Sequence, residues 1–289
     1  MSAPNLPVVR LPGGEVVPAL GLGTWRMGES ARAQRAELAA LRLAVEIGYR
    51  LFDTAEMYGE GGAESVLGQA LSDALRAGDV KREELFIVSK VYPHNASRQG
   101  MLEACERSLA RLGLECIDLY LLHWPGSHPL AETVGAFERL REAGRIRRWG
   151  VSNFDAEALA GLWRVKAGAN CAANQVYYSL AQRGIEFDLL PWQRERKLPT
   201  MAYCPIDQGT LAQSAALQPL ARRLQATPAQ LALAWLVSRG DVIAIPKAVQ
   251  ERHLRDNLAA AVLELDASAC AELDALFGPP HSKQVLAMS

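Results

Sequence analysis

The sequence predicts a closed (β/α)8 TIM barrel, an α/β fold, that occupies residues 1–289 as a single domain. Eight short apolar segments recur along the chain, and segments with helical spacing of apolar residues separate nearly all of them. Apolar strands that alternate with amphipathic helices are typical of a parallel sheet covered by helices. The length of 289 residues fits one such barrel. A doubly wound open sheet is the alternative, but it usually has fewer strands.

The first predicted element is a β-hairpin over residues 8–17, VVRLPGGEVV, with its turn at Pro12, Gly13 and Gly14. In a barrel, such a hairpin can plug the N-terminal end. The barrel strands follow the hairpin, and we expect them at residues 18–25, 49–55, 84–90, 117–124, 147–153, 173–178, 199–205 and 241–247.

Helices are predicted between the strands where apolar residues recur at i, i+3, i+4 and i+7, as in residues 35–48. Thr227 is expected to cap a later helix, with Pro228 at its first position and Gln230 completing a capping box. The polar, proline-interrupted segment after Phe277 is predicted to be a short C-terminal tail that lies over the surface as a loop. Helix C-termini are expected at four glycines, namely Gly48, Gly113, Gly144 and Gly240.

The charge balance excludes several classes of partner. The chain carries 31 Lys and Arg residues against 32 Asp and Glu residues, so we expect neither nucleic acid nor an anionic membrane as a partner. No signal peptide is expected, and no apolar run approaches the roughly 20 residues that cross a bilayer. The five widely spaced cysteines have no zinc-binding spacing, which favours reduced thiols. We expect a cytoplasmic monomer that acts on a small molecule.

Three consecutive predicted strands end in ionisable residues, Asp53, Lys90 and His123, and Tyr58 follows Asp53 by five residues. In this type of barrel the active site lies at the carboxyl ends of the strands. Each residue alone has an ordinary structural explanation, such as a helix cap for Asp53 or a solvated charge for Lys90. Together they favour a site, because a buried lysine needs an anionic partner and Asp53 can supply one.

These four residues suit acid catalysis by a phenol. The pKa of a free tyrosine is about 10, and we expect the ammonium group of Lys90 to lower the pKa of Tyr58 towards the operating pH. The carboxylate of Asp53 would fix the lysine, and His123 could orient a carbonyl oxygen towards the phenol. The set contains no obvious nucleophile and no cluster of histidines and carboxylates that would hold a metal.

At these residues the sequence resembles the aldo-keto reductase family, and the resemblance covers almost the whole chain. The matching segments are GLGTW, LFDTAEMYG, VSK, LLHW, GVSNF, NQVYY, AYCP and IPKAV. Asp53, Tyr58, Lys90 and His123 fall where the family has its catalytic tetrad. The segments DTAEMYGEGGAE, SKVYPHNA and GRIRRWGVSN look most like a bacterial branch associated with methylglyoxal and other small aldehydes. The resemblance implies reversible, NADPH-dependent carbonyl reduction without a metal, with Tyr58 as the proton donor.

The resemblance also implies where a nicotinamide cofactor binds, since no G-x-G-x-x-G motif follows a strand and opens a helix as a Rossmann fold requires. Ser152, Asn153 and Gln175 are expected to form hydrogen bonds with the carboxamide. Tyr203 is expected to stack on the nicotinamide ring. The loop from Pro205 to Leu211 is expected to cover the pyrophosphate.

At the other end of the cofactor, the resemblance places Lys247 at the 2′-phosphate of NADPH and Asn257 at the adenine. Family members often follow that lysine with Ser and carry Arg six residues after it, but here those positions are Ala248 and His253. We therefore expect NADPH to be preferred by a reduced margin, with NADH binding at lower affinity. Two nearby arginines could supply the missing guanidinium, Arg252 or Arg255.

The substrate pocket is expected to be lined by Trp25, Tyr92 and Trp124, beside Tyr58 and His123. Aromatic walls with two polar groups favour a small carbonyl compound with a modest apolar part. A cofactor-binding regulatory subunit on the same fold, with little turnover, is also compatible with the retained tetrad. A metal-dependent barrel enzyme is disfavoured, because it needs ligands at several strand ends and His123 alone qualifies.

Overall fold

The computed structural model describes residues 6–288, and within them it contains an eight-stranded parallel sheet in which each strand pairs with the next along the chain. Each predicted strand segment overlaps one of these strands, although β5 and β7 each extend one residue beyond the predicted range, so the predicted order is confirmed. The strands are β3 (Leu22–Gly23), β4 (Leu51–Asp53), β5 (Phe86–Val91), β6 (Ile117–Leu122), β7 (Ile146–Ser152), β8 (Asn174–Tyr177), β9 (Thr200–Tyr203) and β10 (Val242–Ala244).

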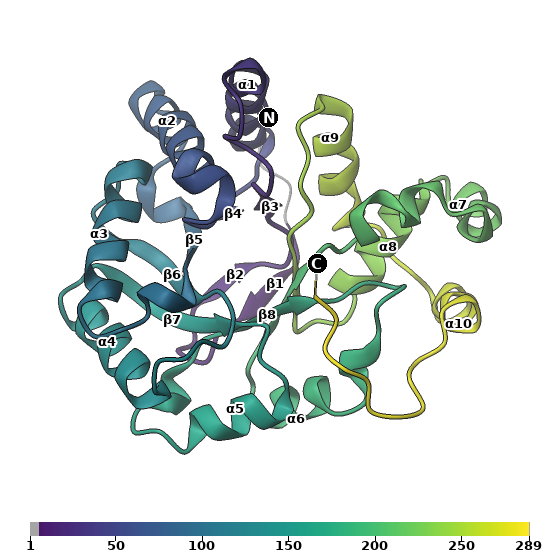
Figure 1. Ribbon diagram of the computed structural model, residues 1–289. Coiled ribbons are helices and arrows are strands. Elements are labelled where there is room, and N and C mark those ends of the chain that lie inside the picture. Colours follow the sequence, from purple (N-terminus) through teal and green to yellow (C-terminus); the bar gives the residue numbers. More distant parts are fainter. Residues whose placement is uncertain (1–5, 289) are drawn as a thin grey trace.

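The sheet closes into a barrel through parallel bridges between the first and last strand segments. Leu20 pairs with Ala244 and Gly23 pairs with Lys247, and the amide of Gly23 donates to the carbonyl of Pro246 at 3.0 Å. A Cβ atom on Gly23 would lie 2.9 Å from the carbonyl oxygen of Ile245, so this close approach requires glycine. The resulting ring of strands, with helices around it, is visible in Figure 1.

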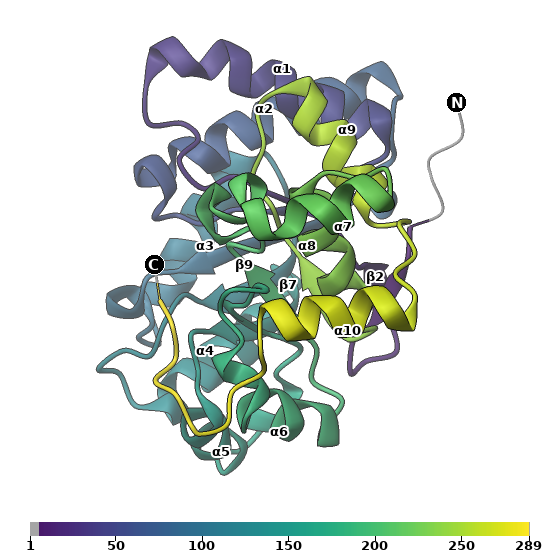
Figure 2. The ribbon, with the colours of Figure 1, turned by 90° about the vertical axis from the view of Figure 1, so that its right-hand side faces the viewer.

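Helices follow the strands and cover the outer face of the barrel (Figures 1 and 2). The predicted capping box is confirmed, since the Thr227 hydroxyl accepts from the Gln230 amide at 3.2 Å and the Gln230 side chain accepts from the Thr227 amide at 2.8 Å. Gly48 and Gly113 end their helices in the left-handed conformation, as predicted. The helices are α1 (Ala31–Ile47), α2 (Gly62–Ala77), α3 (Gly100–Leu112), α4 (Leu130–Glu142), α5 (Ala156–Trp163), α6 (Leu189–Glu195), α7 (Gln218–Arg223), α8 (Pro228–Val237), α9 (Glu251–Ala260) and α10 (Ala267–Leu276).

The predicted N-terminal hairpin is present as the antiparallel strands β1 (Val8–Arg10) and β2 (Val16–Pro18). Val9 and Val17 are buried, and Glu15 in the turn pairs with Arg148 near the start of β7 at 2.7 Å. The hairpin therefore covers the N-terminal end of the barrel and leaves the opposite end to the strand-end side chains.

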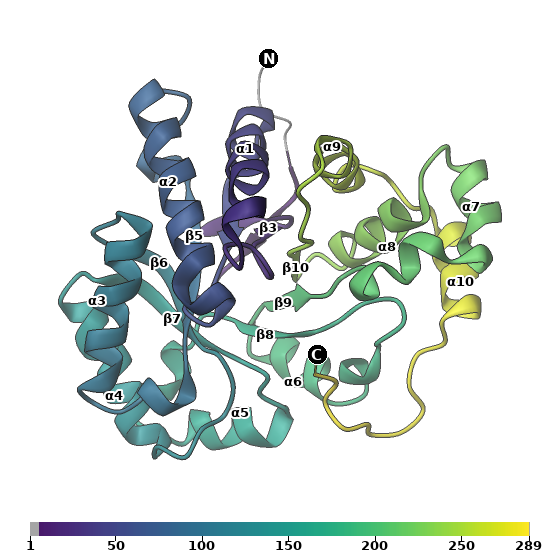
Figure 3. The ribbon, with the colours of Figure 1, turned by 45° about the horizontal axis from the view of Figure 1, so that its top comes forward.

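The segment after α10 forms the predicted loop, with no helix or strand in residues 278–288. Figures 1 and 3 show it returning to the mouth of the barrel. Among the described helices, none combines the length and apolar composition required to cross a bilayer.

Candidate active site

The four predicted catalytic residues lie together at the carboxyl ends of β4 to β6. Asp53 ends β4, Lys90 is the penultimate residue of β5, and His123 directly follows β6. Tyr58 begins the short 3-10 turn Tyr58–Gly61 that leads from β4 to α2. Because parallel strands present their carboxyl ends at one rim of the barrel, residues far apart in the sequence meet there.

Lys90 is the centre of the cluster. Its ammonium group donates to Asp53 Oδ2 at 2.7 Å, to the Thr54 carbonyl at 2.9 Å and to the Tyr58 hydroxyl at 3.2 Å. The Lys90 side chain is fully buried, and burial acts to lower its pKa. Asp53 and Tyr58 outweigh burial, so the net pKa of Lys90 is raised and the residue remains an ammonium ion.

Gln175 joins this cluster from the opposite side of Asp53. Its side-chain amide donates to Asp53 Oδ1 at 2.8 Å, so both carboxylate oxygens of Asp53 accept hydrogen bonds. Gln175 is the second residue of β8, and its contact with Asp53 was not predicted. The buried carboxylate is thereby held in one orientation towards Lys90.

The predicted lowering of the Tyr58 pKa is wrong as a net effect. Burial of the phenol raises the pKa of Tyr58, Lys90 lowers it, and Asp53 raises it. Lys90 therefore lowers the pKa as predicted, but burial raises the pKa by more, because a buried phenolate loses its hydration. Tyr58 remains a neutral phenol at neutral pH, which is the form that can donate a proton.

His123 faces the tyrosine from β6, and its ring meets the Tyr58 ring edge-on at 5.7 Å. Burial, together with the charge of Lys90, lowers the pKa of His123 to about 2, so the imidazole is neutral. Its Nδ1 atom is buried and has no hydrogen-bond partner among the described residues. An N–H at Nδ1 would lack an acceptor, so we assign the single proton to Nε2.

The neutral state of His123 has a consequence for stability. An unfolded chain binds a proton on this histidine below its ordinary pKa of 6.5, whereas the folded chain does so only near pH 2. Stability is therefore lost as the pH falls below 6.5, by about 2 kcal/mol for this residue at pH 5. Between pH 7 and pH 5, we expect the free energy of unfolding of His123→Gln to fall by about 2 kcal/mol less than that of the unmodified chain, measured by urea unfolding. Equal losses would show that His123 ionises within the fold.

The predicted substrate-pocket residues are half-buried aromatics. Trp124 lies 4.9 Å from the His123 ring and 5.9 Å from the Tyr92 ring, which makes a continuous aromatic wall. Trp25 follows β3 and packs under the guanidinium of Arg26 at 4.5 Å. The wall provides apolar surface beside two polar groups, the Tyr58 hydroxyl and the His123 imidazole.

Three of the predicted nicotinamide residues form a hydrogen-bonded group next to His123. The Asn153 amide donates to the His123 carbonyl at 3.0 Å and to the Ser152 hydroxyl at 3.2 Å. The Tyr203 hydroxyl donates to Asn153 Oδ1 at 2.9 Å. Asn153, which directly follows β7, has a left-handed backbone with φ of 59°.

The loop predicted to cover the pyrophosphate borders a pocket. Pro205 and Leu211, which bound the loop, are both buried. The pocket is lined by Ala181, Asp207, Gln208, Gly209, Thr210, Leu211, Gln213, Ser214 and Phe277.

The residues predicted to bind the 2′-phosphate and adenine lie on or before α9. Lys247 is exposed and makes no ion pair within residues 6–288. The N-terminus of α9 has no side-chain cap, so its amides are available to an anion. His253 is exposed on the first turns of α9, whereas Asn257, one turn later, and Ala248 are buried.

Comparison with known proteins decides the family of this chain. The sequence profile described as "Aldo/keto reductase family" matches residues 19–277. The chain belongs to the aldo/keto reductase family. It is therefore an NAD(P)H-dependent oxidoreductase, and the predicted family and barrel fold are confirmed.

Individual members of the aldo/keto reductase family are similar over nearly the whole chain. The methylglyoxal reductase YeaE of Escherichia coli K12 is 45% identical and covers 97% of this chain and 98% of its own. The glyoxal reductase of Bacillus subtilis is 32% identical over 93% of this chain and 92% of its own. An aldo-keto reductase from Klebsiella pneumoniae in complex with NADPH is 47% identical, covers 98% and 99% of the two chains, and superimposes with a TM-score of 0.92.

Proposed function

We propose that this aldo/keto reductase uses NADPH to reduce small aldehydes and ketones, such as methylglyoxal, to alcohols, as a monomer with one domain. The observation that carries the proposal is the buried chain from Asp53 through Lys90 to the Tyr58 hydroxyl, with a neutral His123 beside it. The similarity to a methylglyoxal reductase and to a structure in complex with NADPH supports it.

In this reaction Tyr58 donates the proton that the carbonyl oxygen acquires, while NADPH supplies hydride to the carbonyl carbon. Lys90 stabilises the phenolate that forms on Tyr58, because its ammonium lies 3.2 Å from the hydroxyl. Asp53 and Gln175 hold Lys90 and its charge in place. The Nε2–H of His123 orients the carbonyl oxygen, and a neutral imidazole can do so without competing with Tyr58 as an acid.

The chain offers groups that fit each part of NADPH. Ser152, Asn153 and Gln175 provide hydroxyl and amide groups for the carboxamide, and Tyr203 a ring for the nicotinamide. The loop from Pro205 to Leu211 covers the pyrophosphate. At the far end, the unpaired Lys247 and the uncapped N-terminus of α9 suit the 2′-phosphate, with His253 and Asn257 on the same helix.

Substrate size follows from the aromatic wall. Tyr92 and Trp124 form this wall and Trp25 adds a further aromatic face, so the expected pocket offers apolar surface. A small carbonyl compound fits this wall better than a polyol or a large charged substrate.

The proposal is tested by following absorbance of the reduced nicotinamide during turnover. We expect oxidation of NADPH with methylglyoxal and other small aldehydes, and slower oxidation with large charged carbonyl compounds. A protein that binds NADPH but turns over none of these substrates would contradict the proposal.

Cofactor preference depends on His253. Both neighbouring arginines are engaged on α9, Arg252 with Asp256 at 3.4 Å and Arg255 with Glu251 at 2.8 Å. The exposed imidazole of His253 lacks the planar fork with which Arg grips phosphate. We expect His253→Arg to tighten NADPH by about fivefold with little change for NADH, measured as dissociation constants by fluorescence quenching.

The matched control for this prediction is His281→Arg, which adds the same charge on the exposed tail outside α9. An unchanged ratio of NADPH to NADH affinity in the His253 variant would mean that His253 does not contact the phosphate, and Arg252 or Arg255 would become the candidates.

A further inference from the structure

The loop that follows β9 is built on an unfavourable backbone. Asp207 and Gln208 have φ values of 51° and 52°, in the left-handed region that side chains disfavour, and Gly209 follows at 99°. Cys204, at the start of the same turn, has φ of 48°. Such a conformation persists only where surrounding contacts hold it.

The backbone hydrogen bonds of this loop are local. Asp207 N donates to Cys204 O at 2.9 Å, Gly209 N to Ile206 O at 3.0 Å, and Thr210 N to Asp207 O at 3.0 Å. These bonds close successive turns, but they do not attach the loop to the barrel. A side-chain contact from another element adds to the buried ends, Pro205 and Leu211, in fixing the loop in place.

Tyr177 supplies such a contact from the end of β8. It is 8% exposed, pairs with Tyr203 in the sheet register, and its hydroxyl donates to the carboxylate of Asp207. The Tyr177 and Tyr203 rings lie 5.4 Å apart. The hydrogen bond thus ties a left-handed position of the loop to a barrel strand, and its carboxylate acceptor makes it stronger than a neutral one.

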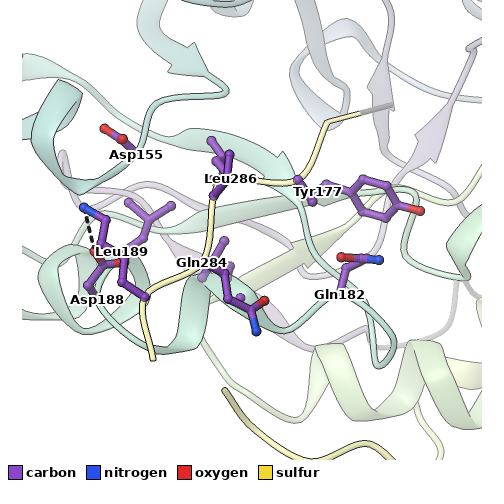
Figure 4. A pocket seen from close by; sticks show the side chains of 12 residues that line it. Asp155, Tyr177, Gln182, Asp188, Leu189, Gln284 and Leu286 are labelled. Atoms are coloured by element: carbon purple, nitrogen blue, oxygen red, sulfur yellow. Dashed lines mark ion pairs between the residues drawn. The ribbon is translucent and has the colours of Figure 1, made fainter. Parts of the chain in front are cut away.

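The C-terminal tail packs on the other side of Tyr177. Tyr177 lines a pocket together with tail residues that include Gln284 and Leu286, and Leu286 packs against the core (Figure 4). The preceding residue of the tail, Lys283, pairs with Asp188 at 3.3 Å. In Figure 4 the Tyr177 ring extends away from Gln284 and Leu286, and its hydroxyl donates to Asp207 in the loop.

We propose that Tyr177 is a positioning residue that holds the loop over the cofactor through Asp207 and thereby sets the rate at which NADP(H) leaves. The inference rests on the proposed function, in which this loop covers the pyrophosphate. The Tyr177 hydroxyl donates to Asp207, whereas the Tyr58 hydroxyl accepts from Lys90, so Tyr177 acts through the loop and not on the reacting atoms.

The test is the dissociation rate of NADPH, measured by stopped-flow fluorescence after mixing the loaded protein with excess NADP+. We expect Tyr177→Phe and Asp207→Ala each to raise this rate by about tenfold, because each removes a hydrogen bond to a charged group. The double variant should dissociate no faster than either single variant, since both remove one contact. Asp207→Asn keeps an acceptor and tolerates the left-handed backbone, so its rate should stay within about threefold of the unmodified protein.

Tyr178→Phe is the matched control. Tyr178 is the next residue, it is buried, and its hydroxyl donates to Glu186 at 2.7 Å and not to the loop. Its NADPH dissociation rate should be unchanged. Unchanged rates in Tyr177→Phe and Asp207→Ala, or additive effects in the double variant, would overturn the inference. A protein that does not bind NADPH at all would instead refute the proposed function.

Discussion

Replacement of Tyr58 by phenylalanine is expected to slow carbonyl reduction by about 10²–10⁴-fold, the usual cost of losing a positioned general acid. The substitution removes one hydroxyl that accepts from Lys90 at 3.2 Å, and the half-buried ring remains in place. The fold and the affinity for NADPH should therefore survive. Single-turnover oxidation of NADPH with methylglyoxal, alongside a binding titration, measures the two effects separately.

The control for this variant is Tyr120→Phe. Tyr120 is a fully buried tyrosine on β6 whose ring meets Phe137 edge-on at 6.1 Å, outside the catalytic cluster. The Tyr120→Phe variant also loses one phenol hydroxyl, and it should reduce carbonyl compounds at the unmodified rate. A Tyr58→Phe enzyme within a few-fold of the unmodified rate would mean that another group donates the proton.

The second large effect is expected from Lys90→Met. The substitution leaves the buried carboxylate of Asp53 without its cation, and breaking a buried ion pair from one side costs about 3–5 kcal/mol of stability. It also removes the ammonium that lowers the pKa of Tyr58, so the phenolate becomes harder to form and reduction slows. Urea unfolding gives the first quantity, and the pH dependence of single-turnover reduction gives the second.

Asp53→Asn should have a smaller effect on the rate, because Lys90 and its charge remain. The double variant Lys90→Met/Asp53→Asn removes both charges. We expect its loss of unfolding free energy to be smaller than the sum of the two single losses by about 1–3 kcal/mol. Strictly additive losses would show that Asp53 and Lys90 do not act as one electrostatic unit.

An exposed ion pair of the same length provides the comparison. Arg223 and Glu272 also lie 2.7 Å apart, but their side chains are 52% and 36% exposed. Replacing them by Met and Gln should change stability by about 1 kcal/mol or less. The difference between the two pairs isolates the effect of burial around Lys90.

Much of the fold could be predicted because its signals are short-range. The hairpin, the eight strand segments and the capped helix at Thr227 are each defined by a few neighbouring residues, through apolar periodicity or one local hydrogen-bonding pattern. The positions of Asp53, Lys90 and His123 at strand ends follow from the same local pattern. Their joint role came from a resemblance, which the family comparison confirms.

Other features depend on distances that no local pattern specifies. The bridge from Leu20 to Ala244 closes the barrel, and the hydrogen bond from Gln175 to Asp53 spans 122 positions of the chain. Sequence reasoning also missed Tyr177 and Asp207, since a tyrosine at the end of an apolar strand is equally consistent with an ordinary core residue. The one available signal was the position of Asp207 in a loop already predicted to cover the cofactor.

The sequence by itself therefore determined the type and order of the elements and the chemical groups at the mouth of the barrel. Only the tertiary structure decided the protonation of those groups, because a pKa depends on how far folding removes the group from water. Burial reverses the expected shift of Tyr58 and keeps His123 neutral. The tertiary structure also decided the left-handed loop at Asp207, since the Tyr177 hydroxyl that contacts it comes from a strand distant in the sequence.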